Sequence, residues 1–367
     1  MNPRLVVLAF FLACAAGAVA QLEDAGDATQ AKCKQYLETP LPPEAAQVPA
    51  PKQWPDCNSY KLYSGIGTKI DYAAARKCAW SERLAQRADL EPKYTVGSVF
   101  GDSAVLAVMY ANGDGVQRVL RLAGRLVCEA GGAPAEIGIR LEHVESLSKI
   151  TTAPAPKFDF CDDITSGFMQ GFCAAYESEM QDDKRTHSLK SISSRFTPPQ
   201  LTAFDHLLKS QQAYARAHAR GEIDLGGTAR AMYQIDAEDT LQDDFIEALR
   251  SFESGKYPKG SAEDYRNADS RLNLAYRKAI SDAEKHKQDY GAVQPDGIRD
   301  AERAWLKYRD AWTSFAKLRY PAVTAAAWLE LLTNDRTSVL NGSFCDMDDM
   351  EGLCAQQGPA WKPSPLP

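Results

Sequence analysis

The stretch that decides the fold lies in the last third of the chain and reads Asp296-Gly-Ile-Arg-Asp-Ala-Glu-Arg-Ala-Trp-Leu-Lys-Tyr-Arg-Asp-Ala-Trp-Thr-Ser-Phe-Ala-Lys-Leu-Arg-Tyr320. Its apolar residues recur at alternating spacings of three and four, namely at Ile298, Ala301, Trp305, Tyr308, Trp312 and Phe315. This spacing predicts an amphipathic helix that buries its aromatic side chains on one face. We expect Asp296 to cap the first amides and Gly297 to ease the entry of the chain.

Helical periodicity also extends outward from this stretch. Residues 157–262 are predicted to be a middle helical segment, and residues 263–341 a C-terminal three-helix unit around the quoted helix. Residues 342–367 form a polar, proline-ended tail. We therefore predict an all-α protein with little or no β-sheet.

The C-terminal unit resembles the LprI-type lysozyme-inhibitor domain family. The residues that carry the resemblance are Asp269, Leu272, Asn273 and Tyr276, then Trp305, Tyr308, Arg309 and Asp310, then Arg336. The resemblance implies that these residues are mostly structural and that the partner is a protein, with lysozyme as the family's target. Many members carry one cysteine just after the Arg-Asp-Ala run and another on the last helix, where this chain has Trp312-Thr313 and Ala327-Trp328, so we expect buried tryptophans to replace that disulfide.

Residues 57–150 are predicted to form helical hairpins that turn on glycines. Gly113 and Gly115 separate two apolar helical runs, and Gly65 and Gly67 occupy the same places 48 residues earlier. This part resembles the Sel-one-like repeats, relatives of the tetratricopeptide repeat, which hold partners on a concave face. The interval between copies exceeds the family's usual repeat, so residues 88–100 are interpreted as an insertion loop, and residues 137–147 as a closing helix.

The N-terminus indicates export. One basic residue, a short apolar run and an Ala-x-Ala end predict a signal peptide over residues 1–20, cleaved after Ala20. A lipid anchor on Cys14 is the alternative. Residues 21–56 are rich in proline and read as an extended lead-in. No other apolar run approaches the length of a membrane span, so we expect a periplasmic or secreted protein.

Eight cysteines remain after cleavage, and an oxidising compartment favours disulfides between them. Antiparallel hairpin geometry brings Cys57 abreast of Cys78. Cys161 is a candidate partner for Cys173, with Cys128 as the alternative for either, and the partner of Cys33 stays open. In the tail, Cys345 and Cys354 are a further candidate pair.

The charged residues favour a binding protein over an enzyme. A formal net charge of −7 argues against nucleic acid and is compatible with a basic protein partner. No catalytic or metal-binding pattern is found, and the histidines are expected on the surface. The acidic pairs beginning at Asp162 and Asp243 are interpreted as helix starts. Arg309, Asp310 and Arg336 are expected to form a structural ion pair at the bundle edge, or else a recognition surface.

We therefore predict an exported binding protein without a cofactor or enzymatic activity. Inhibition of a lysozyme is the function that the LprI resemblance implies. The alternative is a cell-envelope scaffold that holds another protein on its repeat hairpins.

Overall fold

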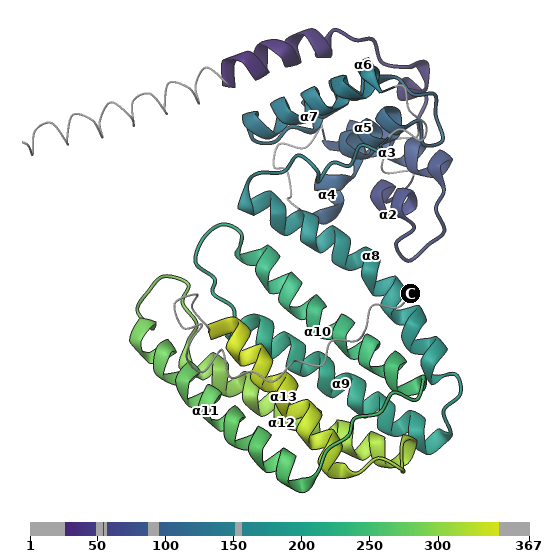
Figure 1. The fold of residues 1–367 in the computed structure, drawn as a ribbon. Coiled ribbons are helices and arrows are strands. Elements are labelled where there is room, and N and C mark those ends of the chain that lie inside the picture. The colour runs from purple at the N-terminus through teal and green to yellow at the C-terminus, as the bar shows by residue number, and fades with distance from the viewer. Residues whose placement is uncertain (1–25, 49–53, 55–56, 87–94, 151–155, 345–367) are drawn as a thin grey trace, which may run out of the picture. The chain divides into compact units, whose positions relative to one another are not determined.

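The computed structural model describes residues 26–48, 54, 57–86, 95–150 and 156–344. Helices, turns and loops occur throughout these ranges, and none of them contains a strand (Figure 1). The prediction of an all-α protein is thus confirmed. The chain forms two compact units, Met1–Tyr176 and Glu177–Pro367, and the boundary falls within helix α8 (Gly167–Ser193).

Unit 1 is built from short helices. They are η1 (Pro43–Ala46), α2 (Ser59–Ser64), α3 (Tyr72–Gln86), α4 (Val96–Phe100), α5 (Asp102–Asn112), α6 (Leu120–Ala130), α7 (Pro134–Ser146) and η3 (Leu147–Lys149). The helices α2 and α3 pack as one hairpin, and α5 and α6 pack as a second. In addition, α3 packs against α5, which joins the two hairpins into one core.

The two hairpin turns have the same backbone conformation. Gly65 and Gly67 have φ angles of 79° and 66°, and Gly113 and Gly115 have φ angles of 78° and 66°. Such left-handed conformations strain residues with a Cβ atom, which explains why glycine stands at all four positions.

After each turn, the returning chain makes the same backbone hydrogen bond to the helix that precedes the turn. The Asp71 amide donates to the Leu62 carbonyl at 2.9 Å, and the Val119 amide donates to the Tyr110 carbonyl at 3.0 Å. The second bond repeats the first at an offset of 48 residues. These hairpins are therefore a structural repeat, while their assignment to the Sel-one-like family stays a prediction.

Part of the expected insertion loop is helical, which corrects the sequence interpretation of residues 88–100. Thr95 and Ser98 form a reciprocal capping box at the start of α4. Phe100 at its end is buried and stacks on Tyr176 with a centroid distance of 4.8 Å. The burial of one aromatic ring stabilises this short helix, which the low apolar content of the segment did not indicate.

The beginning of the described chain is likewise helical and not extended as predicted. Residues 26–37 form a helix, because the prolines of the lead-in all come later in the sequence. A disulfide joins Cys33 to Cys128 and attaches this helix to α6. The Tyr36 hydroxyl donates to the Glu145 carboxylate at 2.8 Å and adds a second attachment, to α7.

Two further disulfides cross-link unit 1. Cys57 is bonded to Cys78, across the first hairpin, and Cys161 is bonded to Cys173. The second of these closes because residues 160–163 turn back before α8 begins. The remaining predicted pair lies outside the described residues: Cys345 and Cys354.

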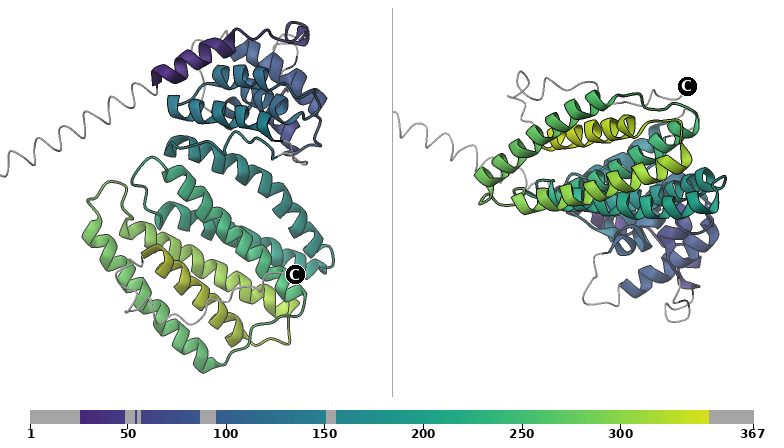
Figure 2. Two further views of the ribbon diagram at one scale, coloured as in Figure 1. Left: turned by 45° about the horizontal axis from the view of Figure 1, so that its top comes forward. Right: turned by 90° about the horizontal axis from the view of Figure 1, so that it is seen from below.

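Unit 2 consists of the end of α8 and five long helices. These are α9 (Pro198–Gly221), α10 (Arg230–Glu253), α11 (Ala262–His286), α12 (Pro295–Arg319) and α13 (Ala325–Phe344). The most extensive contacts join α12 to α9 and α11 to α13. Figure 2 shows α11 and α13 together on one side of the α9 and α12 pair. The three C-terminal helices therefore share their core with α9 and α10.

The start of α12 differs from the sequence prediction. Gln294 is the N-cap residue and its side chain makes no capping bond, while Pro295 occupies the first turn, where its missing N–H costs nothing. Asp296 lies inside the helix and accepts a hydrogen bond from Arg299 at 2.7 Å. Its charge still complements the positive end of the helix.

Gly297 has a packing role in place of the predicted entry role. A Cβ atom added to Gly297 would lie 2.6 Å from the carbonyl oxygen of Gly221, and one added to Gly221 would lie 2.5 Å from the carbonyl oxygen of Gly297. The end of α9 and the start of α12 thus meet backbone to backbone. Only glycine permits this approach.

The apolar stripe of α12 forms the core of unit 2. Trp305, Trp312 and Phe315 are 2%, 1% and 0% exposed. The Trp312 ring lies 6.1 Å from that of Trp328 on α13, measured between centroids. These two tryptophans occupy the places where the resemblance implied cysteines, and their contact ties the same two helices together without a covalent bond.

Candidate functional site

The family-motif residues of α11 have structural positions. Leu272 is buried in the core and Tyr276 packs partly against it. The Asn273 side-chain amide donates to the Asp269 carbonyl oxygen at 2.8 Å and to its carboxylate at 3.1 Å. These bonds lie within one helix face, so they support the helix and present no concave surface.

The motif residues of α12 extend from the core to the surface. Trp305 is buried, and the half-buried Tyr308 stacks on Tyr214 of α9 with a centroid distance of 5.7 Å. Arg309 lies 5.4 Å from the centroid of the Trp305 ring and pairs with Asp310 at 2.9 Å. The side chain of Asp310 is 69% exposed, so this pair is a surface pair of small energy.

Arg336 does not join Arg309 and Asp310 at the bundle edge, as the sequence interpretation had it. Its guanidinium is fully buried and donates to both carboxylate oxygens of Glu222, at 2.6 and 2.8 Å. A further bond reaches Glu302 at 2.9 Å. The sequence reasoning missed Glu222 because it follows a helix end more than 100 residues before Arg336.

Two histidines expected on the surface are hydrogen-bonded inside the protein. His218 is 6% exposed and lies 2.8 Å from Glu222, and the half-buried His143 lies 3.0 Å from Asp163. Burial opposes the ionisation of Glu222, but hydrogen bonds from Arg336 and His218 outweigh it and hold the pKa of this carboxyl below its usual value. The Glu222 cluster is therefore a satisfied structural network.

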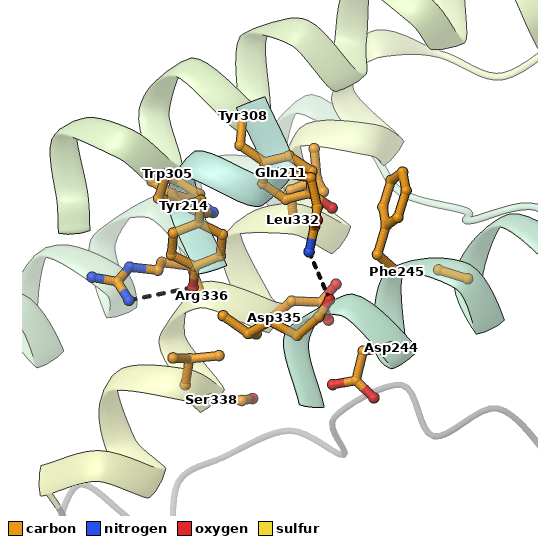
Figure 3. Close-up of a pocket in the computed structure, with 13 residues that line it drawn as sticks. Gln211, Tyr214, Asp244, Phe245, Trp305, Tyr308, Leu332, Asp335, Arg336 and Ser338 are labelled. Carbon is orange, nitrogen blue, oxygen red and sulfur yellow. Dashed lines mark hydrogen bonds between the residues drawn. The ribbon is translucent and has the colours of Figure 1, made fainter. Parts of the chain in front are cut away.

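A pocket of about 410 Å³ lies beside this network, between α10 and α13 (Figure 3). Its floor comes from α9 and α12, through Gln211, Tyr214, Trp305 and Tyr308. Helix α10 forms one wall, through Leu241, Asp244, Phe245 and Ala248. Helix α13 forms the other, through Leu332, Asp335, Arg336, Ser338 and Val339. An apolar-lined cavity with a few convergent polar groups is the usual form of a binding site.

Two carboxylates, Asp335 and Asp244, face this pocket from its opposite walls. Neither makes an ion pair or hydrogen bond with another described residue. Asp335 is solvent-exposed at the edge of the pocket, yet the surrounding protein and then the charge of Asp244 raise its pKa to about 7. Asp244 is also exposed, and the surrounding protein, with the nearby Glu247 and Asp243, raises its pKa. Among the described residues, the two pocket acids therefore have no cationic partner.

The position of Asp244 corrects its interpretation as part of a helix start. Helix α10 begins at Arg230, so Asp243 and Asp244 lie in its middle turns and point in different directions. Asp243 pairs with Arg185 of α8 at 2.7 Å, whereas Asp244 lines the pocket. Asp335 was missed although it directly precedes Arg336 in the motif, because periodicity correctly places it at the surface but does not show that a pocket lies beside it.

The described residues offer little for a metal. Cys57, Cys78 and Glu82 come close together within the described ranges. Cys57 and Cys78 are bonded to each other, so their sulfurs are not available as thiolate ligands.

Part of the chain that lines the pocket is similar to a known protein family. Residues 259–340 match the sequence model of the family described as lysozyme inhibitor LprI. This segment is LprI-like. No curated protein and no solved structure matches the chain.

The LprI-like segment covers α11, α12 and nearly all of α13, and it supplies Trp305, Tyr308 and Asp335 to the pocket. Helices α9 and α10 lie outside the match and supply the rest, including Asp244 and the partner of Arg336. The pocket is thus assembled from the LprI-like helices and from preceding helices of the same unit. Among the helices described, none has the length and apolar character needed to cross a membrane.

Proposed function

We propose that this chain is an exported protein that binds and inhibits a lysozyme by protein-to-protein contact. The observation that carries the proposal is the match of residues 259–340 to the lysozyme inhibitor LprI family. Three disulfides in unit 1 support export, since such bonds persist in oxidising compartments.

The accessible groups of unit 2 favour contact through the pocket between α10 and α13. Most of the LprI-motif side chains are buried or engaged within unit 2, as Leu272 and Arg336 are, and have no free group to offer a partner. The acids of the pocket, by contrast, have no described counter-ion. Lysozyme is a basic protein whose cleft works through two carboxylates, so an acidic inhibitor is steered toward it electrostatically.

The test uses purified residues 21–367 in a turbidity assay of bacterial cell-wall lysis with several types of lysozyme. We expect the lysis rate to fall as the protein is added and to level off near a one-to-one molar ratio with the susceptible lysozyme. The reduced and alkylated protein serves as the unfolded control. Unchanged lysis by every lysozyme at about tenfold molar excess, where a micromolar complex would be well populated, would refute the proposal.

A cell-envelope scaffold is the second candidate function, and the repeated hairpins of unit 1 favour it. Stacked helical hairpins present an extended surface that repeat proteins use to bind partners, and Ile70, which follows the first hairpin turn, is 55% exposed and is a position at which this surface can be probed. In a pulldown from envelope extract, Ile70→Glu should release a partner that wild-type protein retains. Loss of that partner with unchanged lysozyme inhibition would assign the two functions to different surfaces.

A further inference from the structure

We propose that the pocket between α10 and α13 receives one lysine or arginine side chain of a basic partner protein, held between Asp335 and Asp244 against the ring of Tyr308. The identity of the partner as a lysozyme rests on the proposed function. The chemistry of the pocket does not, because it follows from the side chains that line it.

The charged side chains that line the pocket are two acids and one base that is already paired. Asp335 and Asp244 have no cationic partner among the described residues. Among the described residues of the lining, Arg336 is the single basic side chain, and its guanidinium is occupied by Glu222 and Glu302. A cation from outside is therefore the group that this pocket lacks.

The walls of the pocket are suited to a long cationic side chain. Trp305, Tyr308 and Phe245 line the pocket, and aromatic faces attract lysine and arginine head groups while the apolar surface accepts their methylene stems. The Tyr308 hydroxyl makes no hydrogen bond to another described residue. It is thus an additional acceptor for an N–H donor. The volume of about 410 Å³ admits one long side chain with its bound water.

The pocket acids lower the stability of the free protein. The protein environment and Asp244 raise the pKa of Asp335, which means that the ionised carboxylate is held at a cost in the folded state. A bound cation removes this cost, because an opposite charge favours ionisation. Groups that destabilise the free fold in this way are concentrated at binding sites.

The test measures the binding of a hexa-arginine peptide to residues 21–367 by calorimetry, with hexa-citrulline as the neutral isostere. We expect arginine to bind about tenfold more tightly than citrulline or better, and Asp335→Asn or Asp244→Asn to remove that difference. Tyr308→Phe should weaken binding by a smaller factor. The control is Asp205→Asn, which changes the net charge equally at an exposed position of α9 outside the pocket, and should bind like wild type.

Two results would overturn the proposal. Equal weakening by Asp205→Asn and Asp335→Asn would mean that only the overall charge attracts the peptide. Binding that appears only after removal of residues 345–367 would mean that the chain's own tail occupies the pocket.

The lysozyme assay separates this inference from the proposed function. If Asp335→Asn loses arginine binding but inhibits lysozyme like wild type, the pocket binds a cationic side chain but not one of lysozyme, and the assignment of lysozyme as its partner is wrong. If the wild-type protein binds arginine selectively and inhibits no lysozyme, the pocket stands and the inhibitor proposal fails.

Discussion

The guanidinium of Arg336 and the carboxylate of Glu222 form a two-pronged ion pair, with N–O distances of 2.6 and 2.8 Å, in the interior of unit 2. Both side chains are fully buried, and the pair joins α13 to the end of α9. It thereby connects the LprI-like helices to a part of the chain that the family match does not cover.

Removal of one partner of this pair should destabilise the protein strongly. Arg336→Met leaves the Glu222 carboxylate buried beside Glu302, and such breaks cost about 3–5 kcal/mol. The double variant Arg336→Met with Glu222→Leu should recover part of the loss, because Glu222 is then no longer buried without its partner, while Glu302 still lacks the Arg336 guanidinium. Urea unfolding of the single and double variants measures both effects, and a double variant no more stable than the single one would contradict this account.

Trp305 is predicted to be a core residue whose loss opens a cavity. Its side chain is 2% exposed, so Trp305→Ala should lower the free energy of unfolding by about 3–5 kcal/mol. The adjacent Leu306, at 36% exposed, is the matched control, and Leu306→Ala should cost less than about 1 kcal/mol. Equal effects in chemical denaturation would show that Trp305 is not part of the core.

The contact between Gly221 and Gly297 predicts opposite effects for the same substitution at two glycines. Gly297→Ala forces a methyl group against the Gly221 backbone and should destabilise by about 1–3 kcal/mol. Gly342, in α13, has open space around the position of a Cβ atom, so Gly342→Ala should stabilise by up to about 1 kcal/mol through helix propensity. Thermal melts of both variants show whether the signs differ as expected.

Asp335 predicts a pH-dependent gain in stability on substitution. Its folded-state pKa of about 7 lies above the usual value of 3.8, so the folded protein binds the proton more tightly than the unfolded chain does. The stability supplied by the protonated form is therefore present below pH 3.8 and is lost as the pH rises to about 7. Asp335→Asn should be more stable than wild type by about 1 kcal/mol near pH 8, a value discounted for solvent contact, and similar to it near pH 4.

Chemical denaturation at the two pH values, with Asp205→Asn as the control, measures this effect. A variant that is less stable than wild type near pH 8 would mean that Asp335 has a stabilising partner. Greater stability combined with loss of arginine binding would instead identify Asp335 as a binding residue that the fold does not need.

Much of the fold followed from local patterns. The three-and-four spacing of apolar residues predicted the α12 helix and its buried face, including Trp305 and Trp312. Turn glycines predicted the paired hairpins, because positive φ angles are nearly exclusive to glycine. The helix at residues 26–37 was not predicted, since its few apolar residues depend on a disulfide and on distant partners.

The candidate site could be predicted only in part. The resemblance included Tyr308 and Arg336 but gave no indication that they line a pocket. In the sequence, Asp335 and Asp244 looked like ordinary surface acids. An acid becomes part of a pocket through the helices placed around it, and that placement is set by contacts between residues far apart in the chain.

By itself, the sequence determined that this protein is all-α, where most of its helices lie, and which face of α12 is buried. The tertiary structure decided that α12 packs on α9, that Arg336 pairs with Glu222, and that two acids share one cavity. Periodicity reports that a helix face avoids water, which is a property of one segment. It carries no information on which other face covers it, because every amphipathic helix of the chain offers apolar surface of the same kind.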